Sequence, residues 1–497
     1  MATRALRSAD PAEGGAGAPE PELVIGLVAA VGAPLDLIQT LLAELLEGLD
    51  YDTELLRLSD YTHSFLLEAE KGGQGEAARI DAAMKRGNEA RRKTRRNDVL
   101  ALVAIADIRG KRGAEARPLP GRAFVLRQLK RPEEVELLRR TYGEGFVLLG
   151  VYCRRSERRR QLELEGIGSS EAEALIRRDE HEDEMGGQEL RKTFHLADLF
   201  IEASDDPEAS RDALKRAVHL LFGLGISTPT KTEYGMFHAY AASLRSAQLG
   251  RQVGAALLSD LGDVISVGAN EVPRFGGGQY WEGEKPDARD HERGRDSSDE
   301  AEEEIIREIL DRIDPEWASA SPEKRRHLIE DRRARLQSTR ITSLTEFGRA
   351  VHAEAETIVS AARLGVSPRG AALYCTTFPC HVCAKHIVAA GITSVTYIEP
   401  YPKSRALDLH EDSISLEDDD GSKVVFRPFV GVAPRFFARL FAMTTWDGSE
   451  IPRKDADGRP IMDRVHLRLR MPYLSALQRE NQVAEQLRAL TPKGETR

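Results

Sequence analysis

The chain has 497 residues, a formal net charge of -10 and 41% hydrophobic residues. This length exceeds a single ordinary core and predicts two or three domains, and the hydrophobic content is sufficient for globular cores. The acidic balance argues against a protein whose main task is to bind the nucleic-acid backbone, because such proteins normally present a basic surface.

The first 21 residues are rich in Ala, Gly, Pro and Glu and lack the apolar stretch of a signal peptide. This composition predicts a disordered tail. The longest apolar runs of the chain are too short and too often broken by glycine to span a bilayer. We therefore expect a cytoplasmic protein without a membrane contact.

Residues 22–232 alternate strand-like and helix-like patterns. An apolar run at 22–32 precedes a helical pattern at 33–49, and the run at 123–129 precedes a helical pattern at 131–143 and a fully apolar strand at 146–153. Strand, helix and strand at this spacing are typical of a parallel sheet with helices on its faces.

The segment "GLVAAVGAP" lies where a phosphate-binding P-loop would lie, between a strand and a helix. A working P-loop has four residues between its glycines, followed by a lysine and a hydroxyl residue. Here five residues separate Gly26 from Gly32, and Ala33 and Pro34 follow. This degenerate loop predicts no efficient phosphoryl transfer. We expect either a regulatory domain that responds to a nucleotide, an RNA or a protein, or a purely architectural domain.

A basic cluster at 87–98 contains Arg91 and Arg92. Our hypothesis is that these residues and the loop glycines bind an anionic regulator, either a nucleotide or a small RNA. The alternative is a solvated helix face.

The second block, 233–442, begins with a helical pattern up to residue 248. A predicted β-hairpin follows, with strands at 252–260 and 264–270. Residues 282–346 form a highly charged insertion with helical patterns at 299–313 and 321–336. A helix (352–364), a strand (371–376), a second helix (380–390) and a second strand (394–399) come next. The C-terminal extension, 443–497, is left unassigned.

Three of the four cysteines, Cys375, Cys380 and Cys383, lie within nine residues, and Cys153 lies far away. This pattern indicates a reduced protein with one metal site. Cys380 and Cys383 are separated by one helical turn, so both thiols share a face at a helix start that favours thiolates. A local clip would complete the site with His381, His386 or Cys375, although the two histidines fit the usual Cys₂His₂ spacing poorly.

A second way to complete the site uses "VHAEAE" at 351–356. If two helix starts face each other, His352, Cys380 and Cys383 surround one Zn²⁺ per chain and leave a fourth position for water, as in catalytic zinc sites. Glu354 would then carry protons between the water and the substrate. H-x-E followed by P-C-x-x-C is the signature of zinc-dependent deaminases.

Beyond this signature, "RSAQLGRQVGA" (245–255), "GANEVP" (268–273) and "LYCTTFPCHVCAKHIVAAGITSVTYIEPYPKS" (373–404) resemble segments of the deoxycytidylate deaminase family. In "GANEVP", a glutamate replaces the second glycine of that family's G-x-N-G-x-P loop. The resemblance implies substrate contacts at particular positions: Asn270 to the sugar, Ser246, Lys403 and Ser404 to phosphate, and Tyr401 beside the base.

The whole chain is similar to the bacterial anti-phage dCTP deaminases. This similarity implies an α/β chain with an N-terminal P-loop-kinase-like parallel-sheet domain and a C-terminal cytidine-deaminase-like α/β/α domain. It also implies a homo-oligomer that deaminates deoxycytidine nucleotides, dCTP and/or dCMP, and so drains dCTP from phage replication. The alternatives are a housekeeping dCMP deaminase, a nucleic-acid deaminase and a scaffold with a structural zinc.

Overall fold

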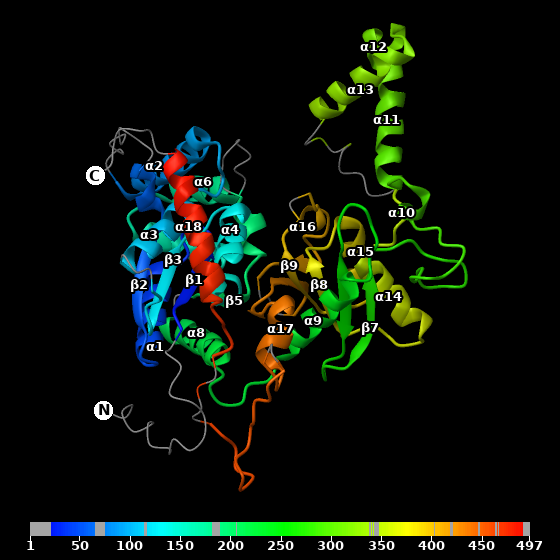
Figure 1. The fold of residues 1–497 in the computed structure, drawn as a ribbon. Helices are drawn as coiled ribbons and strands as arrows, with labels where there is room; N and C mark the ends of the chain where they lie inside the picture. The colour runs from blue at the N-terminus through cyan, green and yellow to red at the C-terminus, as the bar shows by residue number, and fades with distance from the viewer. Residues whose placement is uncertain are drawn as a thin grey trace. The chain divides into compact units, whose positions relative to one another are not determined.

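The structure, a computed structural model, describes residues 21–64, 75–113, 117–180, 189–204, 206–336, 339, 341, 347–401, 403–417, 421–445, 448–462, 465 and 467–490. Of the expected tail, residues 1–20 lie outside the described residues, and so does most of 337–346 of the insertion. The chain divides into two compact units (Figure 1). Unit 1 comprises residues 1–233 and 430–497, and unit 2 comprises residues 234–429.

Unit 1 is built on a six-stranded sheet with the order β12-β5-β4-β1-β3-β2. All pairs are parallel except that of β12 with β5, which confirms the predicted parallel sheet. Every residue of β1 is buried, as expected for a strand covered on both faces. The strands of this sheet are β1 (Leu23–Ala29), β2 (Asp52–Arg57), β3 (Arg122–Arg127), β4 (Phe146–Tyr152), β5 (Leu199–Glu202) and β12 (Gly431–Val432).

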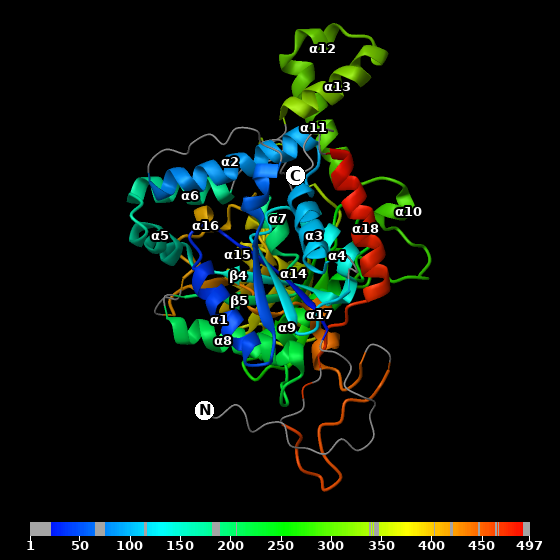
Figure 2. The same cartoon turned by 60° about the vertical axis from the view of Figure 1, so that its left-hand side comes forward.

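The helices of unit 1 cover this sheet. Apolar side chains of α1 and α8 pack with alternate residues of β1 in one buried core, and the two helices lie side by side in Figures 1 and 2. The helical elements are α1 (Leu35–Glu47), η1 (Leu58–Ser64), α2 (Glu76–Thr94), α3 (Val99–Lys111), α4 (Pro132–Tyr142), η2 (Gly143–Gly145), α5 (Arg155–Leu164), α6 (Ser169–Glu180), α7 (Leu190–Phe194), α8 (Pro207–Phe222), α17 (Pro434–Phe441) and α18 (Tyr473–Leu490).

The C-terminal part of the chain returns to unit 1. Residues 430–442 were predicted to belong to the second block, but β12 pairs with β5 and α17 inserts Phe436 and Leu440 into the core of unit 1. The unassigned extension forms α18, which packs against α3 and α4. A two-residue strand and one short helix carry too little local pattern to indicate which core they join.

Unit 2 contains the second six-stranded sheet, with the order β10-β11-β9-β8-β6-β7. The predicted hairpin is confirmed, because β6 and β7 pair antiparallel through a turn in which Gly262 adopts a φ of 99°. β8 pairs antiparallel with β6 and parallel with β9. The strands are β6 (Gly254–Leu258), β7 (Val264–Ala269), β8 (Ala372–Thr377), β9 (Ser394–Glu399), β10 (Ile414–Ser415) and β11 (Val424–Pro428).

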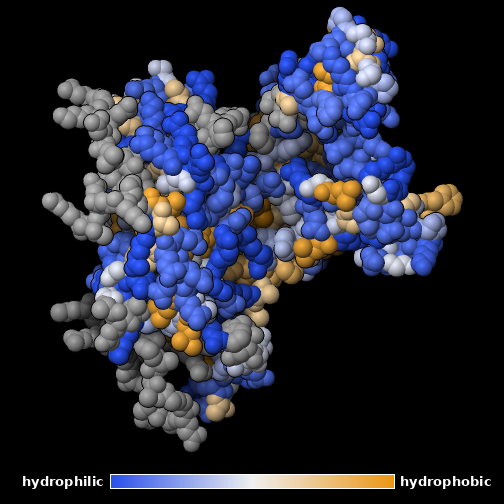
Figure 3. Space-filling view, turned by 45° about the horizontal axis from the view of Figure 1, so that its top comes forward, coloured by the Kyte–Doolittle hydropathy of each residue, from blue (hydrophilic) through white to orange (hydrophobic). Residues whose placement is uncertain are grey.

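The insertion forms a small helical subdomain of its own. Ile306, Leu310, Trp317 and Ile329 make a local core, and Figure 3 shows a largely hydrophilic surface over these helices, in line with the predicted solvated faces. The helices assigned to unit 2 are α9 (Lys231–Ser243), α10 (Asp290–Arg293), α11 (Ser297–Ile313), α12 (Pro315–Ser319), α13 (Pro322–Leu336), α14 (Ala353–Arg363), α15 (His381–Ala389) and α16 (Ala406–Leu409), of which α9 begins at the end of unit 1. Among the described residues, no helix is both long and apolar enough to cross a membrane.

Candidate active site

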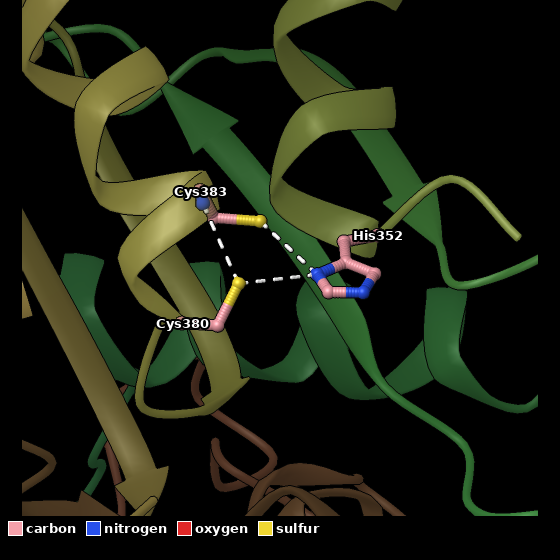
Figure 4. Close-up of side chains that lie close together, drawn as sticks. All are labelled: His352, Cys380 and Cys383. Carbon is pink, nitrogen blue, oxygen red and sulfur yellow. Dashed lines mark hydrogen bonds between the residues drawn. The ribbon is translucent and has the colours of Figure 1, made fainter. Parts of the chain in front are cut away.

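Two helix starts meet in unit 2, as the sequence predicts. His352 is the N-cap residue of α14, Cys380 is the N-cap residue of α15, and Cys383 lies in the first turn of α15. The Nδ1 atom of His352 lies 3.3 Å from Sγ of Cys380 and 3.4 Å from Sγ of Cys383 (Figure 4). Two sulfurs and one imidazole nitrogen therefore converge on one point, with ligand atoms within 4.8 Å of one another.

The local structure explains why the two cysteines share a side. The backbone N–H of Cys383 donates to Sγ of Cys380 over 3.4 Å, so the first thiol caps the helix that carries the second. The approach to this cap is anchored twice. The N–H of Phe378 donates to the carbonyl of Glu399, and the hydroxyl of Ser404 donates to the carbonyl of Pro379 over 2.8 Å.

The donor atoms of the three side chains, two sulfurs and one imidazole nitrogen, suit a metal of zinc type. Hydrogen bonds from Cys383 and His352 lower the pKa of Cys380 to about 4, so this thiol is a thiolate at neutral pH. The pKa of His352 is raised, mainly by its hydrogen bond to Cys380. Thiolate sulfur and imidazole nitrogen are the ligand types that Zn²⁺ prefers, and three of them leave one coordination position open. The residues present therefore fit a zinc ion.

Glu354 lies beside the cluster in the first turn of α14, and its side chain is buried. Burial raises the pKa of this carboxyl group, and the negative charge of Cys380 raises it further. A carboxyl group with a raised pKa, held next to a metal centre, is suited to accept and return a proton near neutral pH.

The cluster opens into a cavity of about 220 Å³. Of the predicted site residues, the cavity contains Glu354, two of the three metal-site residues and the two candidates for contact with the base and the sugar. Its lining consists of Arg251, Val253, Asn270, His352, Ala353, Glu354, Thr377, Phe378, Cys380 and Tyr401.

The other predicted substrate residues do not line this cavity. Ser246 is buried, and its hydroxyl donates to the carbonyl of Asn270 over 2.7 Å. Ser404 uses its hydroxyl in the anchor described above, and Lys403 lies at the surface. The side chain of Asn270 also holds the backbone, because its Oδ1 accepts from the N–H of Val253 and its Nδ2 donates to the carbonyl of Arg251.

Arg251 is a cavity residue that the sequence analysis did not single out. Its guanidinium group lies 5.0 Å from the centre of the Tyr401 ring and 3.5 Å from a carboxylate oxygen of Glu399, and its side chain is 45% exposed. The sequence signal for Arg251 was its position within "RSAQLGRQVGA", a segment whose neighbouring residues were already singled out. Its place beside Tyr401 depends on β6 and β9 belonging to one sheet.

The local alternatives for the metal site find no support among the described residues. Cys375 is fully buried in β8 within the apolar core of unit 2, and burial raises the pKa of its thiol. His381 and His386 do not belong to the cluster of ligand atoms around His352.

The structure brings together two of the four predicted regulatory residues of unit 1, Gly32 and Arg91, but not Gly26 or Arg92. Gly26 lies within β1, where an added Cβ would lie 2.7 Å from Leu129, so packing requires this glycine. Arg91, expected on a basic surface, is 3% exposed and pairs with the buried Glu134 over 3.0 Å. Arg92 is exposed on α2. Gly32 and Arg91 both line a second cavity, of about 740 Å³.

An internal carboxylate occupies the loop between β1 and α1. Asp179 is fully buried, accepts from the backbone N–H of Val31 over 2.7 Å and pairs with Nζ of Lys130 over 2.9 Å. The backbone N–H of Val31 in this loop is therefore paired with a carboxylate of the same unit.

Comparison with known protein families finds a match that covers most of unit 2. Residues 229–399 match the family model "Cytidine and deoxycytidylate deaminase zinc-binding region". The C-terminal block therefore carries a deaminase-type zinc-binding region. All residues of the metal cluster, Glu354 and Asn270 lie within the matched range, whereas Tyr401 lies just beyond it.

Similar proteins share short stretches with this chain. A deoxycytidylate deaminase of Enterobacteria phage T2 is 46% identical over 55 residues, which is 11% of this chain and 29% of that protein. ComE operon protein 2 of Bacillus subtilis is 43% identical over 53 residues, covering 11% of this chain and 28% of that protein. The chain thus spans less than a third of the length of these relatives.

The dCMP deaminase of the cyanophage S-TIM5 in complex with dCMP and dUMP covers 41% of this chain and 99% of its own, with 19% identity and a TM-score of 0.24.

Proposed function

We propose that the chain is a zinc-dependent hydrolytic deaminase that converts deoxycytidine nucleotides to deoxyuridine nucleotides and ammonia. One observation carries the proposal. The Nδ1 atom of His352 and the sulfurs of Cys380 and Cys383 converge at 3.3–3.4 Å, with the buried Glu354 beside them in one cavity. A purely structural metal site has no need for a buried carboxyl group next to its ligands.

The side chains divide the chemistry between them. A zinc ion held by the cluster would supply a Lewis acid that makes water a better nucleophile. The carboxylate of Glu354 accepts a proton from the water that attacks C4 of the cytosine. It delivers this proton to the ring nitrogen N3, and it then transfers the second proton of the water to the amino group, which leaves as ammonia. The raised pKa of Glu354 makes its carboxylate a stronger base toward the attacking water.

The test of this chemistry is ammonia release by the zinc-loaded protein. Glu354→Gln should lower kcat by at least about 10²-fold, the usual contribution of a general acid–base group, with zinc near one per chain. Glu356→Gln is the matched control, because Glu356 is also buried on α14 but pairs with Arg363 and lies outside the cavity. Normal turnover by Glu354→Gln would refute the assigned role.

Arg251 is our candidate for phosphate recognition, because it is the cationic residue of the cavity lining and is half exposed at its rim. An arginine fork matches phosphate oxygens well. Arg251→Gln should raise KM for dCMP or dCTP by about tenfold, corresponding to one charge-assisted hydrogen bond of about 1.4 kcal/mol. It should leave KM for unphosphorylated deoxycytidine unchanged. Equal effects on both substrates would exclude phosphate recognition by this side chain.

Substrate class decides between the proposed biological roles. We propose that the enzyme acts on dCTP and/or dCMP as a cytoplasmic homo-oligomer and drains dCTP during phage infection. Side-by-side assays of dCTP, dCDP, dCMP and single-stranded DNA separate this role from the alternatives. Turnover of dCMP alone favours housekeeping metabolism, and turnover of DNA favours a nucleic-acid deaminase. A fall in cellular dCTP on infection, dependent on Glu354, supports the defence role.

A regulator of unit 1 is the second part of the proposal. The 740 Å³ cavity lies beyond the carboxyl ends of β1, β2 and β3, where open parallel sheets bind ligands, and Arg57, Arg79 and Arg127 lie in its wall. Nucleotides and a short RNA, titrated against the wild type and Arg127→Glu, test this site. Deaminase activity that no nucleotide or RNA alters, together with no measurable binding, would refute a regulatory role.

A further inference from the structure

One part of the wall of the unit 2 cavity is built from two segments that hold each other. Residues 246–253 wrap around residues 270–272, and together they supply the lining residues Arg251, Val253 and Asn270. The hydroxyl of Ser246 donates to the carbonyl of Asn270 over 2.7 Å, and the N–H of Val253 donates to Oδ1 of Asn270 over 2.7 Å.

Glu271 lies at the centre of this network and is fully buried. One carboxylate oxygen accepts from the backbone N–H of Ala247 over 2.8 Å. The other accepts from the N–H of Val272 over 2.8 Å and from Nε2 of Gln248 over 3.2 Å. The carboxylate therefore connects the two segments of the wall directly.

The backbone of Glu271 connects the same wall to the metal cluster. Its N–H donates to the carbonyl of Val351 and its carbonyl accepts from the N–H of Val351, the residue immediately before His352. Glu271 itself is not part of the cavity lining, so any effect on substrate must pass through its neighbours.

We infer that Glu271 is a positioning residue whose carboxylate fixes the substrate-facing wall formed by Arg251 and Asn270. The inference rests on the proposed function for its kinetic part. A buried carboxylate that accepts three N–H groups is costly to place and strongly directional, so it holds two loops in one geometry more firmly than apolar packing would. Gly or Ala at this position would leave the amide of Ala247 without this acceptor.

The test compares Glu271→Gln with a matched control, Glu233→Gln. Glu233 is equally buried, belongs to unit 1 and also accepts backbone N–H groups, those of Thr230 and Val432. Hydrogen exchange measured by mass spectrometry on peptides covering 245–255 reports the wall without any substrate. The exchange rate of these peptides should be at least about tenfold higher in Glu271→Gln than in the wild type, because exchange follows local opening. In Glu233→Gln the exchange rate of the same peptides should equal that of the wild type.

The kinetic arm should show KM for the deoxycytidine nucleotide raised about tenfold by Glu271→Gln, with kcat within about threefold and zinc near one per chain. If zinc content and kcat fall together with the rise in KM, the inference is overturned in favour of a general folding role. Unchanged exchange on 245–255 would overturn it whatever the kinetics. If the wild type turns over no nucleotide, the proposed function fails while the exchange arm still decides the role of Glu271.

Discussion

Gly268, in β7, lies close against α14, the helix that is capped by His352 and carries Glu354. A Cβ added at this position would lie 2.5 Å from the carbonyl oxygen of Ala353 and 2.6–2.7 Å from Oγ1 and N of Thr357. These separations fall about 0.7–0.9 Å short of an ordinary contact, which begins at 3.4 Å. All three atoms belong to the first turns of α14, so Gly268→Ala must displace the start of that helix.

The expected losses of stability and of zinc affinity follow from this displacement. Overpacking of a rigid site costs about 1–3 kcal/mol, and we expect the upper end because backbone atoms cannot rotate away. A zinc site tolerates ligand displacements of only about 0.2 Å. A shift of His352 by several tenths of an ångström should therefore weaken zinc affinity by about tenfold or more, as loss of a supporting contact does in other zinc sites.

Denaturant unfolding and zinc competition with a chromogenic chelator measure the two effects. Gly250→Ala is the control, because its added Cβ would have no neighbour within 4 Å. This control should unfold within about 0.5 kcal/mol of the wild type. If Gly268→Ala binds zinc and unfolds like Gly250→Ala, the close strand–helix approach does not position the metal ligands.

Three further predictions concern the metal, the pH dependence and the C-terminal helix. Chelation of the metal should abolish ammonia release and lower the melting temperature of unit 2 while leaving that of unit 1 unchanged, and zinc should restore both; a chelator-resistant activity would contradict the metal centre. Burial lowers the pKa of His238 below its usual 6.5, so the unfolded chain binds more protons than the folded chain in mild acid. The stability of unit 2 should therefore be fully present above pH 6.5 and should fall as the pH decreases through the folded-state pKa. In denaturant titrations at pH 5–8, His238→Phe should flatten this slope. Glu480→Ala should destabilise unit 1 by about 3 kcal/mol, because Glu480 is fully buried against Arg112; an unchanged rate of proteolytic release of α18 would contradict this expectation.

Much of unit 2 could be predicted from the sequence because its signals are local. The spacing of Cys380 and Cys383, the H-x-E pattern and the alternation of short strands and helices are read within a few residues. The hairpin of β6 and β7 was predicted from its turn and is confirmed. A parallel sheet was predicted from the spacing of strand, helix and strand, and the parallel pairing of β1 with β3 and β4 confirms it.

The substrate-facing wall was less predictable, because its geometry depends on contacts between distant segments. Ser246 and Asn270 stay predictions for substrate contact, and the structure adds that the side chain of each holds the backbone of the other segment. Arg91 was predicted as part of a basic surface, but Glu134, 43 residues away, draws it into the interior. A charge pattern along one helix cannot reveal a partner on another element.

Residue spacing alone was enough to predict the chemistry that unit 2 can offer: two thiols on one helix start, an imidazole and a carboxyl group on another, and alternating strands and helices around them. Only the tertiary structure decided that Nδ1 of His352 faces both sulfurs, that Arg251 reaches the cavity and that Glu271 joins its walls. The physical reason is that ligand spacing follows the period of one helix, whereas a cavity is formed by the packing of elements that lie far apart in the chain.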